Sequence, residues 1–300
     1  MIDKDKKLSH VILNVDKNVP EESIRAFCTN ITSEYDKIWF TYLSYDNQIP
    51  GQDVTGLSEV IKDDTEKDGL FVITDSGRAA DLVSENGIAC AGLGRTGQAS
   101  VGLSKLLYCI EDIEYMPLSR IKRMWERYHD IPWTIAETPR LVIREQTVCD
   151  VESLYEIYSD KEIVRYTEDL YEDPQDEAEY MRQYIDNQYR FFEYGIWAVT
   201  LKESGTLIGR AGISLREGYD IPEIGYVIGR QYQNRGYAKE ALKAILDYAS
   251  RELEMDEFIA FTKEKNTPSV KLLKSLGFIR RGHSLIKGGE HSMYSLTKCQ

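Results

Sequence analysis

The chain has 300 residues, of which 42% are hydrophobic and 29% are charged, and its net charge is −13. This composition is typical of a folded, soluble protein, and no apolar run reaches the roughly 20 residues that a membrane-spanning helix needs. The acidity argues against a nucleic-acid partner, because binding to phosphates requires a basic face. It suits an amine-bearing or cationic partner, or it simply keeps the protein in solution.

The N-terminus and the cysteines indicate the compartment. Met1 to Lys7 are not followed by the apolar stretch of a secretory signal, so we expect a cytoplasmic protein that does not use a membrane. The five cysteines are scattered and show no CxxC spacing, which is typical of reduced thiols and not of disulfides or a zinc site. The length favours two domains, since a single core rarely grows beyond about 250 to 300 residues.

The first part of the chain alternates short apolar strands with helical segments. We expect strands at 10–14, 37–43, 70–74, 87–90 and 106–110, and helices at 21–28, 57–61 and 77–86. Such alternation predicts a parallel sheet covered by helices. The sequence therefore predicts a small Rossmann-like α/β domain over residues 1–118.

One segment of this domain has a family likeness. Val72-Ile73-Thr74-Asp75-Ser76, followed by Ala79-Ala80 and Gly87-Ile88-Ala89-Cys90, resembles the later part of haloacid-dehalogenase-like phosphatases. In that family the first strand ends in two aspartates one residue apart, and the first is the nucleophile. The matching positions here are Asn14 and Asp16, and an amide cannot attack phosphorus as a carboxylate does. The resemblance implies a degenerate domain of this kind, with a generic α/β domain as the alternative.

A helix and a break separate the two domains. Large apolar residues recur at helical spacing from residue 118 to 129, which predicts a helix that bridges or packs the two domains. The segment Ile131-Pro132-Trp133 ends it. We therefore expect a linker over residues 119–137 and a second domain over residues 138–300.

The second domain has a different order of elements. It is predicted to run strand, two helices, three strands, helix, strand, helix and two strands. The expected strands are 140–144, 196–199, 207–213, 223–228, 257–262, 278–286 and 292–297, and the expected helices begin at 150, 177, 238 and 267. No internal repeat or low-complexity segment interrupts this order.

The turn Gln233-Asn234-Arg235-Gly236-Tyr237-Ala238 lies between the strand 223–228 and the helix that follows. A helix N-terminus leaves backbone N–H groups without partners, and its dipole favours negative charge, so a tight loop at this point can wrap a pyrophosphate. Gly236 lets the backbone approach closely, and Arg235 adds a cation. An ordinary loop that leads into a helix is the alternative.

Both the order of elements and this turn resemble the GNAT acetyltransferase superfamily, whose pyrophosphate loop is Gln/Arg-x-x-Gly-x-Gly/Ala. Asn266-Thr267-Pro268-Ser269, followed by Gly277-Phe278, is similar to the family's Asn-x-x-Ser/Ala…Gly-Phe signature. Glu223-Ile224-Gly225-Tyr226 and the segment 138–144 point to the Rim-type branch, whose named members acetylate the N-terminal residue of ribosomal proteins. The resemblance covers residues 138–298 and implies a mixed-sheet α+β domain.

The resemblance implies acetyl-CoA as the co-substrate. It would lie in a splay between the strand that carries Glu223 and the next parallel strand, with its pantetheine on the backbone and its pyrophosphate on the loop. The residues expected to bind it are Val227, Ile228, Gln233, Asn234, Arg235, Gly236, Tyr237, Ala238 and Asn266. For Tyr237, packing against its own helix is the alternative.

Two residues are candidates for catalysis. The family places a general base at Glu223, whose alternative is a carboxylate that marks the solvated end of the strand. Many relatives have a tyrosine at the position of Leu273, and leucine cannot donate a proton. The family then suggests Ser269, reached through Asn266 or water, as the group near the sulfur. Capping of the helix by both residues is the alternative, as is unassisted departure of the thiolate.

The acceptor pocket is predicted to be formed by the variable first half of this domain. The candidate side chains are Tyr166, Tyr171, Tyr180, Tyr184, Trp197 and Tyr226, with Glu168, Asp169, Glu172 and Asp173 offering negative charge to an ammonium group. The leading hypothesis is an N-acetyltransferase that acts on a primary amine, either a protein N-terminus or a small molecule. The alternative is a sensor or partner-docking module that binds acetyl-CoA with little turnover. The sequence leaves the acceptor and the oligomeric state open.

Overall fold

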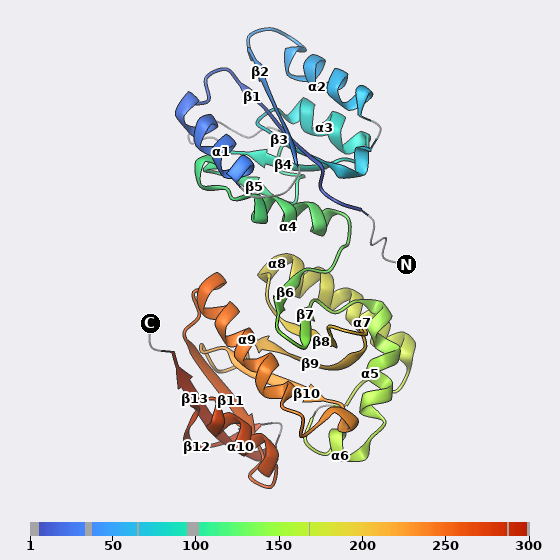
Figure 1. The fold of residues 1–300 in the computed structure, drawn as a ribbon, viewed down its shortest axis with the longest axis vertical. Helices are drawn as coiled ribbons and strands as arrows, with labels where there is room; N and C mark the ends of the chain where they lie inside the picture. The colour runs from blue at the N-terminus through green and yellow to red at the C-terminus, as the bar shows by residue number, and fades with distance from the viewer. Residues whose placement is uncertain are drawn as a thin grey trace. The chain divides into compact units, whose positions relative to one another are not determined.

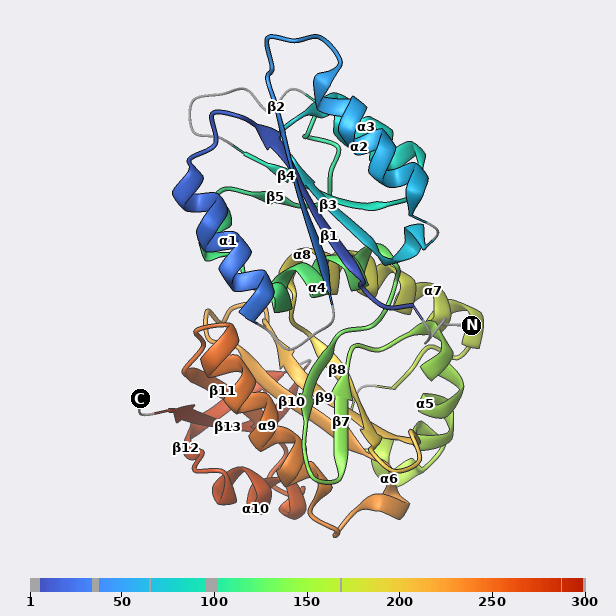
Figure 2. The ribbon, with the colours of Figure 1, turned by 45° about the horizontal axis from the view of Figure 1, so that its top comes forward.

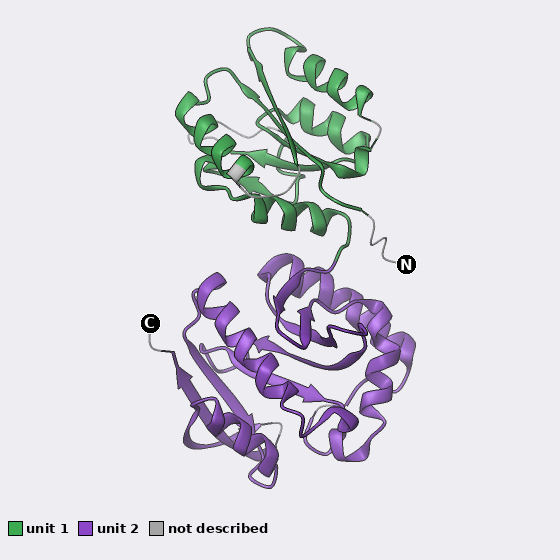
Figure 3. Cartoon of the chain, in the orientation of Figure 1, with its two compact units in different colours: residues 1–131 green, residues 132–300 purple. Residues whose placement is uncertain are grey.

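The structure, a computed structural model, describes residues 6–33, 38–64, 66–94, 102–167, 169–286 and 288–298. The chain forms two compact units, Met1–Ile131 and Pro132–Gln300, which Figure 3 colours separately. The division between them falls inside the segment 119–137. Each unit has a sheet and a core of its own.

Unit 1 contains a five-stranded sheet in the order β2-β1-β3-β4-β5, in which all neighbouring strands are parallel. The strands are β1 (His10–Asp16), β2 (Trp39–Tyr45), β3 (Leu70–Thr74), β4 (Ala89–Leu93) and β5 (Cys109–Ile110), and the helices are α1 (Glu21–Ser33), α2 (Gln52–Asp63), α3 (Gly77–Glu85) and α4 (Leu118–Tyr128). The predicted parallel-sheet α/β class is therefore confirmed.

The helices of unit 1 cover both faces of its sheet (Figure 1). Successive side chains of a strand point to opposite faces, and β1 accordingly buries Leu13 with α1 and α4 and Ile12 with α2 and α3. The apolar face of α4 belongs to this core, where Trp125 is 2% exposed and donates from Nε1 to the carbonyl of Asp68 at 2.8 Å. The helix expected to bridge or pack the two domains thus contributes to the core of unit 1.

Asn14 and Asp16 join the carboxyl ends of neighbouring strands. Asn14 is buried in β1, and its Nδ2 donates to the carbonyl of Asp53 at 2.9 Å. The carboxylate of Asp16 accepts from the backbone N–H groups of Asn18 at 2.9 Å and Asn47 at 3.1 Å. These contacts order the loops after β1 and β2. The likeness of this domain to haloacid dehalogenases stays a prediction.

Unit 2 contains an eight-stranded mixed sheet in the order β12-β13-β11-β10-β9-β8-β7-β6, in which the described pair β10–β11 is parallel and the others are antiparallel. The strands are β6 (Thr134–Glu137), β7 (Leu141–Arg144), β8 (Ile196–Leu201), β9 (Leu207–Ser214), β10 (Glu223–Ile228), β11 (Glu257–Thr262), β12 (Ile279–Ile286) and β13 (Gly289–Thr297). The helices are α5 (Val151–Tyr158), α6 (Lys161–Val164), α7 (Pro174–Tyr184), α8 (Arg190–Phe192), α9 (Tyr237–Glu252) and α10 (Thr267–Ser275). The mixed-sheet prediction for this half is confirmed.

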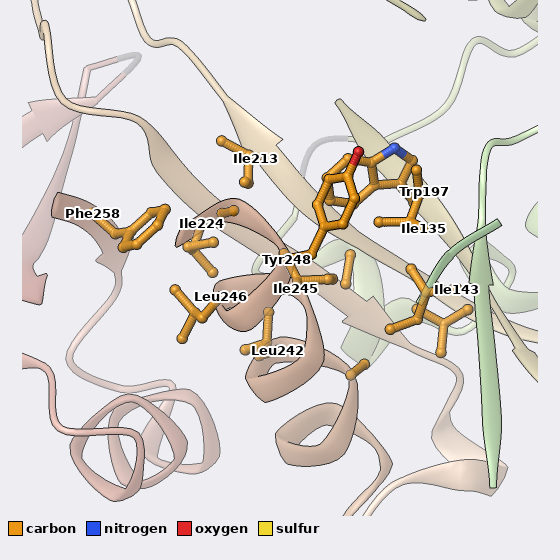
Figure 4. Close-up of a cluster of buried hydrophobic side chains, with 14 of the residues drawn as sticks. Ile135, Ile143, Trp197, Ile213, Ile224, Leu242, Ile245, Leu246, Tyr248 and Phe258 are labelled. Atoms are coloured by element: carbon orange, nitrogen blue, oxygen red, sulfur yellow. The ribbon is translucent and has the colours of Figure 1, made fainter. Parts of the chain in front are cut away.

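Helix α9 lies across one face of this sheet (Figure 2), where its apolar side chains form the main core of unit 2 (Figure 4). Leu242, Ile245 and Leu246 of α9 are at most 4% exposed. The rings of Tyr248 and Trp197 meet edge to face with centroids 5.7 Å apart. Helices α5 and α7 pack on side chains of β8 and β9, including Ala198 and Leu207. Strand β10 contacts both layers, through Ile224 and Ile228 on one face and Val227 on the other.

Three findings concern the cysteines, membranes and metals. Cys28, Cys90, Cys109 and Cys149 are free thiols, and Cys299 lies outside the described residues. No helix in the described ranges is long and apolar enough to cross a membrane. In the same ranges, no cluster of three or more histidine, cysteine or carboxylate side chains is arranged to hold a metal ion.

Candidate active site

Strands β10 and β11 separate almost as soon as they meet. Their described register consists of the pair Glu223–Ile259, next to a backbone hydrogen bond of 2.9 Å from Ile259 to Pro222. On its other edge, β10 stays paired with β9 as far as Ile228. The backbone of β10 is therefore open toward β11 after its first residue. A splay at this place is what the family resemblance implies.

A cavity of about 1140 Å³ occupies the splay. It is lined by the whole of β10, by the turn before α9, by residues 260–263 and by the first turn of α10. Pockets for one drug-sized ligand are usually about 300 to 1000 Å³. The cavity is thus large enough for a cofactor arm and a second substrate together.

The turn before α9 has the geometry of an anion site. Gly236 precedes the helix with φ 82°, and Asn234 has φ 61°. The side chain of Gln233 donates to the carbonyl of Ile228 at 2.9 Å and ties the turn to the end of β10. By helix geometry, the N–H groups of Tyr237 and Ala238 have no partner within the helix. They can therefore bind an anionic ligand in the cavity that both residues line.

Arg140 contacts this turn but does not line the cavity. Its Nη1 donates to the carbonyl of Arg235 at 2.9 Å, and its guanidinium lies 4.5 Å from the ring centroid of Tyr237. Glu240 accepts from Arg140 Nε at 2.7 Å and from Thr138 Oγ1 at 2.7 Å. The side chain of Arg235 is exposed and does not line the cavity. Tyr237 packs against Arg140 and also lines the cavity, and its part in binding the donor stays a prediction.

Glu223 lies at the start of β10 and lines the cavity, with 8% of its surface exposed. Its two carboxylate oxygens accept from Arg216, at 2.5 Å from Nε and 3.1 Å from Nη2. A bidentate pair of this kind fixes the plane of the carboxylate. The remaining lone pairs can accept a proton from an amine or a water in the cavity.

Ser269 and Asn266 lie at the N-terminus of α10 and line the same cavity. Asn266 caps the helix, since its Oδ1 accepts from the N–H of Ser269 at 3.3 Å. The hydroxyl of Ser269 accepts from the phenol of Tyr226 on β10 at 3.0 Å. Leu273, one turn further along α10, is 2% exposed and packs in the core. Capping by Asn266 is therefore present, and the serine hydroxyl is available for a second role.

The predicted acceptor residues separate into two groups. The cavity is lined by Tyr166, Tyr180, Tyr184 and Tyr226, whereas Tyr171 and Trp197 do not line it. None of the described carboxylates Asp169, Glu172 and Asp173 lines it either, and Asp173 caps α7 through the N–H of Gln175. Glu168 lies outside the described residues.

Basic side chains on the cavity were not foreseen from the sequence. They are Arg210, Arg216, Lys239, Lys263 and Lys265. Arg210 could have been singled out from the sequence, because an arginine inside the apolar strand 207–213 is rarely buried unless it is paired. Its Nε donates to Tyr158 Oη at 2.8 Å, and its guanidinium lies 4.9 Å from the centroid of that ring. These five cations outnumber Glu162 and Glu223, which also line the cavity, and such a balance suits an anionic ligand.

Comparison with known proteins identifies the second unit. The profile of the family described as "Acetyltransferase (GNAT) domain" matches residues 140–279. The chain is 34% identical over 146 residues to the uncharacterized N-acetyltransferase YnaD of Bacillus subtilis (strain 168), and the match covers 48% of this chain and 82% of YnaD.

Solved structures are similar to the same half of the chain. A GNAT-family acetyltransferase from Bacillus anthracis is 26% identical, with 54% of this chain and 96% of that chain covered and a TM-score of 0.47. Ribosomal-protein-S5-alanine acetyltransferase from Vibrio fischeri is 18% identical, with 54% and 95% covered and a TM-score of 0.47. The assignment itself rests on the sequence matches, by which this chain belongs to the GNAT family and is an acetyltransferase.

Proposed function

We propose that unit 2 transfers the acetyl group of acetyl-CoA to a primary amine, on a protein N-terminus or on a small molecule. The observation that carries this proposal is the parting of β10 from β11 next to a glycine-capped helix N-terminus, within one cavity. The Rim-type likeness of Glu223-Ile224-Gly225-Tyr226 makes a peptide N-terminus the first acceptor to test.

The donor would be held by backbone at both ends. Alternate residues of β10 direct their backbone groups to β9 and to the open gap. The amides of pantetheine would bond to the groups that face the gap, in the stretch that includes Val227 and Ile228. The pyrophosphate would lie on the N–H groups that begin α9, and Lys239 of the cavity lining adds positive charge.

Acetyl transfer needs a neutral amine, a polarised carbonyl and a proton for the leaving sulfur. Glu223 would accept the proton of the ammonium group, directly or through a water, while Arg216 keeps the carboxylate in place. Free N–H groups on the open edge of β10 would polarise the thioester carbonyl. Ser269 would lie near the sulfur.

The test measures thiol release from acetyl-CoA with a panel of amines that includes peptides with free N-termini. Glu223→Gln is expected to lower kcat by about 100-fold or more, the usual contribution of a general base, and to leave the affinity for CoA unchanged. Glu137→Gln is the matched control, because Glu137 is exposed and pairs with Lys202 away from the cavity. A wild-type protein that binds CoA and releases no thiol with any amine would instead favour a sensor. Full activity of Glu223→Gln would exclude this glutamate as the base.

A further inference from the structure

The acid that protonates the leaving thiolate is missing from its usual position in the family, which Leu273 occupies. Ser269 by itself is a poor substitute. A thiol has a pKa of about 8.5 and a phenol has one of about 10, whereas a serine hydroxyl does not ionise in this range. A serine that simply gave its proton to the sulfur would become an alkoxide. A second, more acidic group behind the serine would lower this cost, because the negative charge would end on that group and not on the serine.

The structure holds such a group in Tyr226. Its phenol donates to Ser269 Oγ at 3.0 Å, although the two residues are 43 positions apart in the chain. Both side chains line the cavity. Among the described residues, no acceptor is found for the hydroxyl proton of Ser269, so this proton is free to point into the cavity. The backbone N–H of Ser269 is held by Asn266, which fixes the first turn of α10 and with it the serine.

The surroundings keep Tyr226 protonated. Burial raises the pKa of its phenol, and the hydrogen bond with Ser269 lowers that pKa only in part. The tyrosine therefore enters each cycle as a proton donor, and a tyrosinate formed during turnover would regain a proton readily at neutral pH.

We propose that Tyr226 acts through Ser269 as the proton source for the leaving thiolate of CoA, which assigns it a role in the acetyl transfer proposed above. The amine nitrogen forms a bond to the acetyl carbon, and the carbon–sulfur bond breaks with its electron pair on sulfur. The Ser269 hydroxyl proton passes to sulfur while the Tyr226 phenol proton passes to Ser269. The tyrosinate then takes up, through water, the proton that the nitrogen loses when it becomes an amide, and the proton that Glu223 took from the ammonium group leaves to solvent. Tyr226 is thus a positioning residue and not a catalytic one, because the group at the sulfur is Ser269.

The chain offers a matched control for this pair. Tyr219 donates to Ser284 Oγ at 2.9 Å, within the same unit, and neither residue lines the cavity. Tyr219→Phe removes the same kind of hydrogen bond at a place that lies outside the cavity. Any effect found at Tyr226 and absent at Tyr219 therefore belongs to the cavity.

The experiment compares the full-length wild type with Tyr226→Phe, Ser269→Ala, the double variant and Tyr219→Phe, using acetyl-CoA and the best amine of the panel. Tyr226→Phe and Ser269→Ala are each expected to lower kcat by about 10- to 100-fold, with KM for acetyl-CoA within about twofold of wild type. The double variant should be no slower than Ser269→Ala, because both residues serve one proton path. Tyr219→Phe should keep the wild-type kcat.

A second readout separates proton transfer from support of the fold. The wild-type kcat is measured in mixtures of light and heavy water and plotted against the deuterium fraction. Two protons that move together should give a curved plot, and Tyr226→Phe should give a straight one. An active wild type whose Tyr226→Phe variant keeps kcat within twofold would overturn the inference and leave the proposed function intact. Independent, multiplicative losses in the double variant would also overturn it. A wild type that turns over no amine would overturn both.

Discussion

Gly236 has φ 82°, a backbone conformation that costs an alanine about 1 to 2 kcal/mol. The nearest atom to an added Cβ would be Arg140 Nη2 at 3.4 Å, so the strain comes from the backbone and not from lack of space. We expect Gly236→Ala to raise KM for acetyl-CoA about 10-fold, because the turn can no longer present its N–H groups in the same way. Steady-state kinetics and thermal unfolding measure the two effects.

Gly218→Ala is the control for this prediction. Gly218 has φ 85°, has no atom within 4 Å of an added Cβ and does not line the cavity. It should lose similar stability and keep the wild-type KM. Equal KM values for the two alanine variants would mean that the turn before α9 does not bind the donor.

Individual site residues differed in how far the sequence could predict them. The turn from Gln233 to Ala238 was recognisable because all its parts are neighbours in the chain. The partner of Glu223 was not, since Arg216 comes from the loop after β9 and nothing local marks its direction. The contact between Tyr226 and Ser269 depends on how β10 and α10 meet, so the sequence only supplied the serine and left the tyrosine as a candidate for the acceptor pocket.

Among the elements, the link between the β6–β7 hairpin and α9 determines the position of the anion site. Glu240 in the first turn of α9 accepts from Thr138 and Arg140, and Arg140 in turn holds the carbonyl of Arg235. Burial would raise the pKa of Glu240, but the hydrogen bonds from Thr138 and Arg140 and the charge of Arg140 outweigh it, and the pKa lies below its ordinary value. The ionised form is therefore the one that stabilises the fold.

We expect Glu240→Gln to lower the free energy of unfolding by about 1 to 2 kcal/mol at neutral pH. A carboxyl whose pKa is lowered on folding contributes stability above its unfolded pKa of about 4.3, and the contribution is lost as the pH falls through the native pKa. The difference from wild type should thus be constant from pH 8 to 5 and shrink below about pH 4. Urea unfolding across this pH range measures the difference in free energy. Glu252→Gln is the control, because Glu252 is an exposed residue of the same helix. A difference that grew on acidification would contradict the assignment.

Most elements of both units could be predicted from apolar spacing, and the exceptions have local causes. β6 was missed because it is a four-residue strand with one buried aliphatic side chain, Ile135, and lies at the edge of the described sheet beside β7. The predicted single helix from 177 is divided by a π-helical turn at Ile185–Tyr189, which buries the ring of Tyr189. The three helical pieces follow one another without a gap in the chain, so the pattern predicted them as one helix.

At the scale of the whole molecule, each unit has the means to fold by itself. The buried clusters of unit 1 centre on β1 and β3, and those of unit 2 centre on α9 and on α5 with α7. The sequence indicated two domains through the change in the order of elements. The sequence could not indicate to which domain α4 belongs. Helical spacing identifies an apolar face but not the residues that pack against it.

Separate cores predict separate unfolding. Leu13 is fully buried in unit 1, and Ile245 is fully buried in unit 2. Truncation of either residue to alanine should cost about 2 to 5 kcal/mol, since it leaves a cavity in a packed core. We expect Leu13→Ala to lower the unfolding temperature of one calorimetric transition and to leave the affinity for CoA unchanged.

Ile245→Ala tests the converse, because it weakens the core beneath β10 and α9. It should lower the other transition, and only that transition should rise when CoA is added, since a ligand stabilises the unit that binds it. If each variant moved both transitions equally, the units would unfold as one and the cores would not be energetically independent. If CoA instead raised the transition that Leu13→Ala lowers, the donor site would have to lie in unit 1. The sequence of unit 1 offers no motif like the turn before α9, so this result would contradict the proposed site.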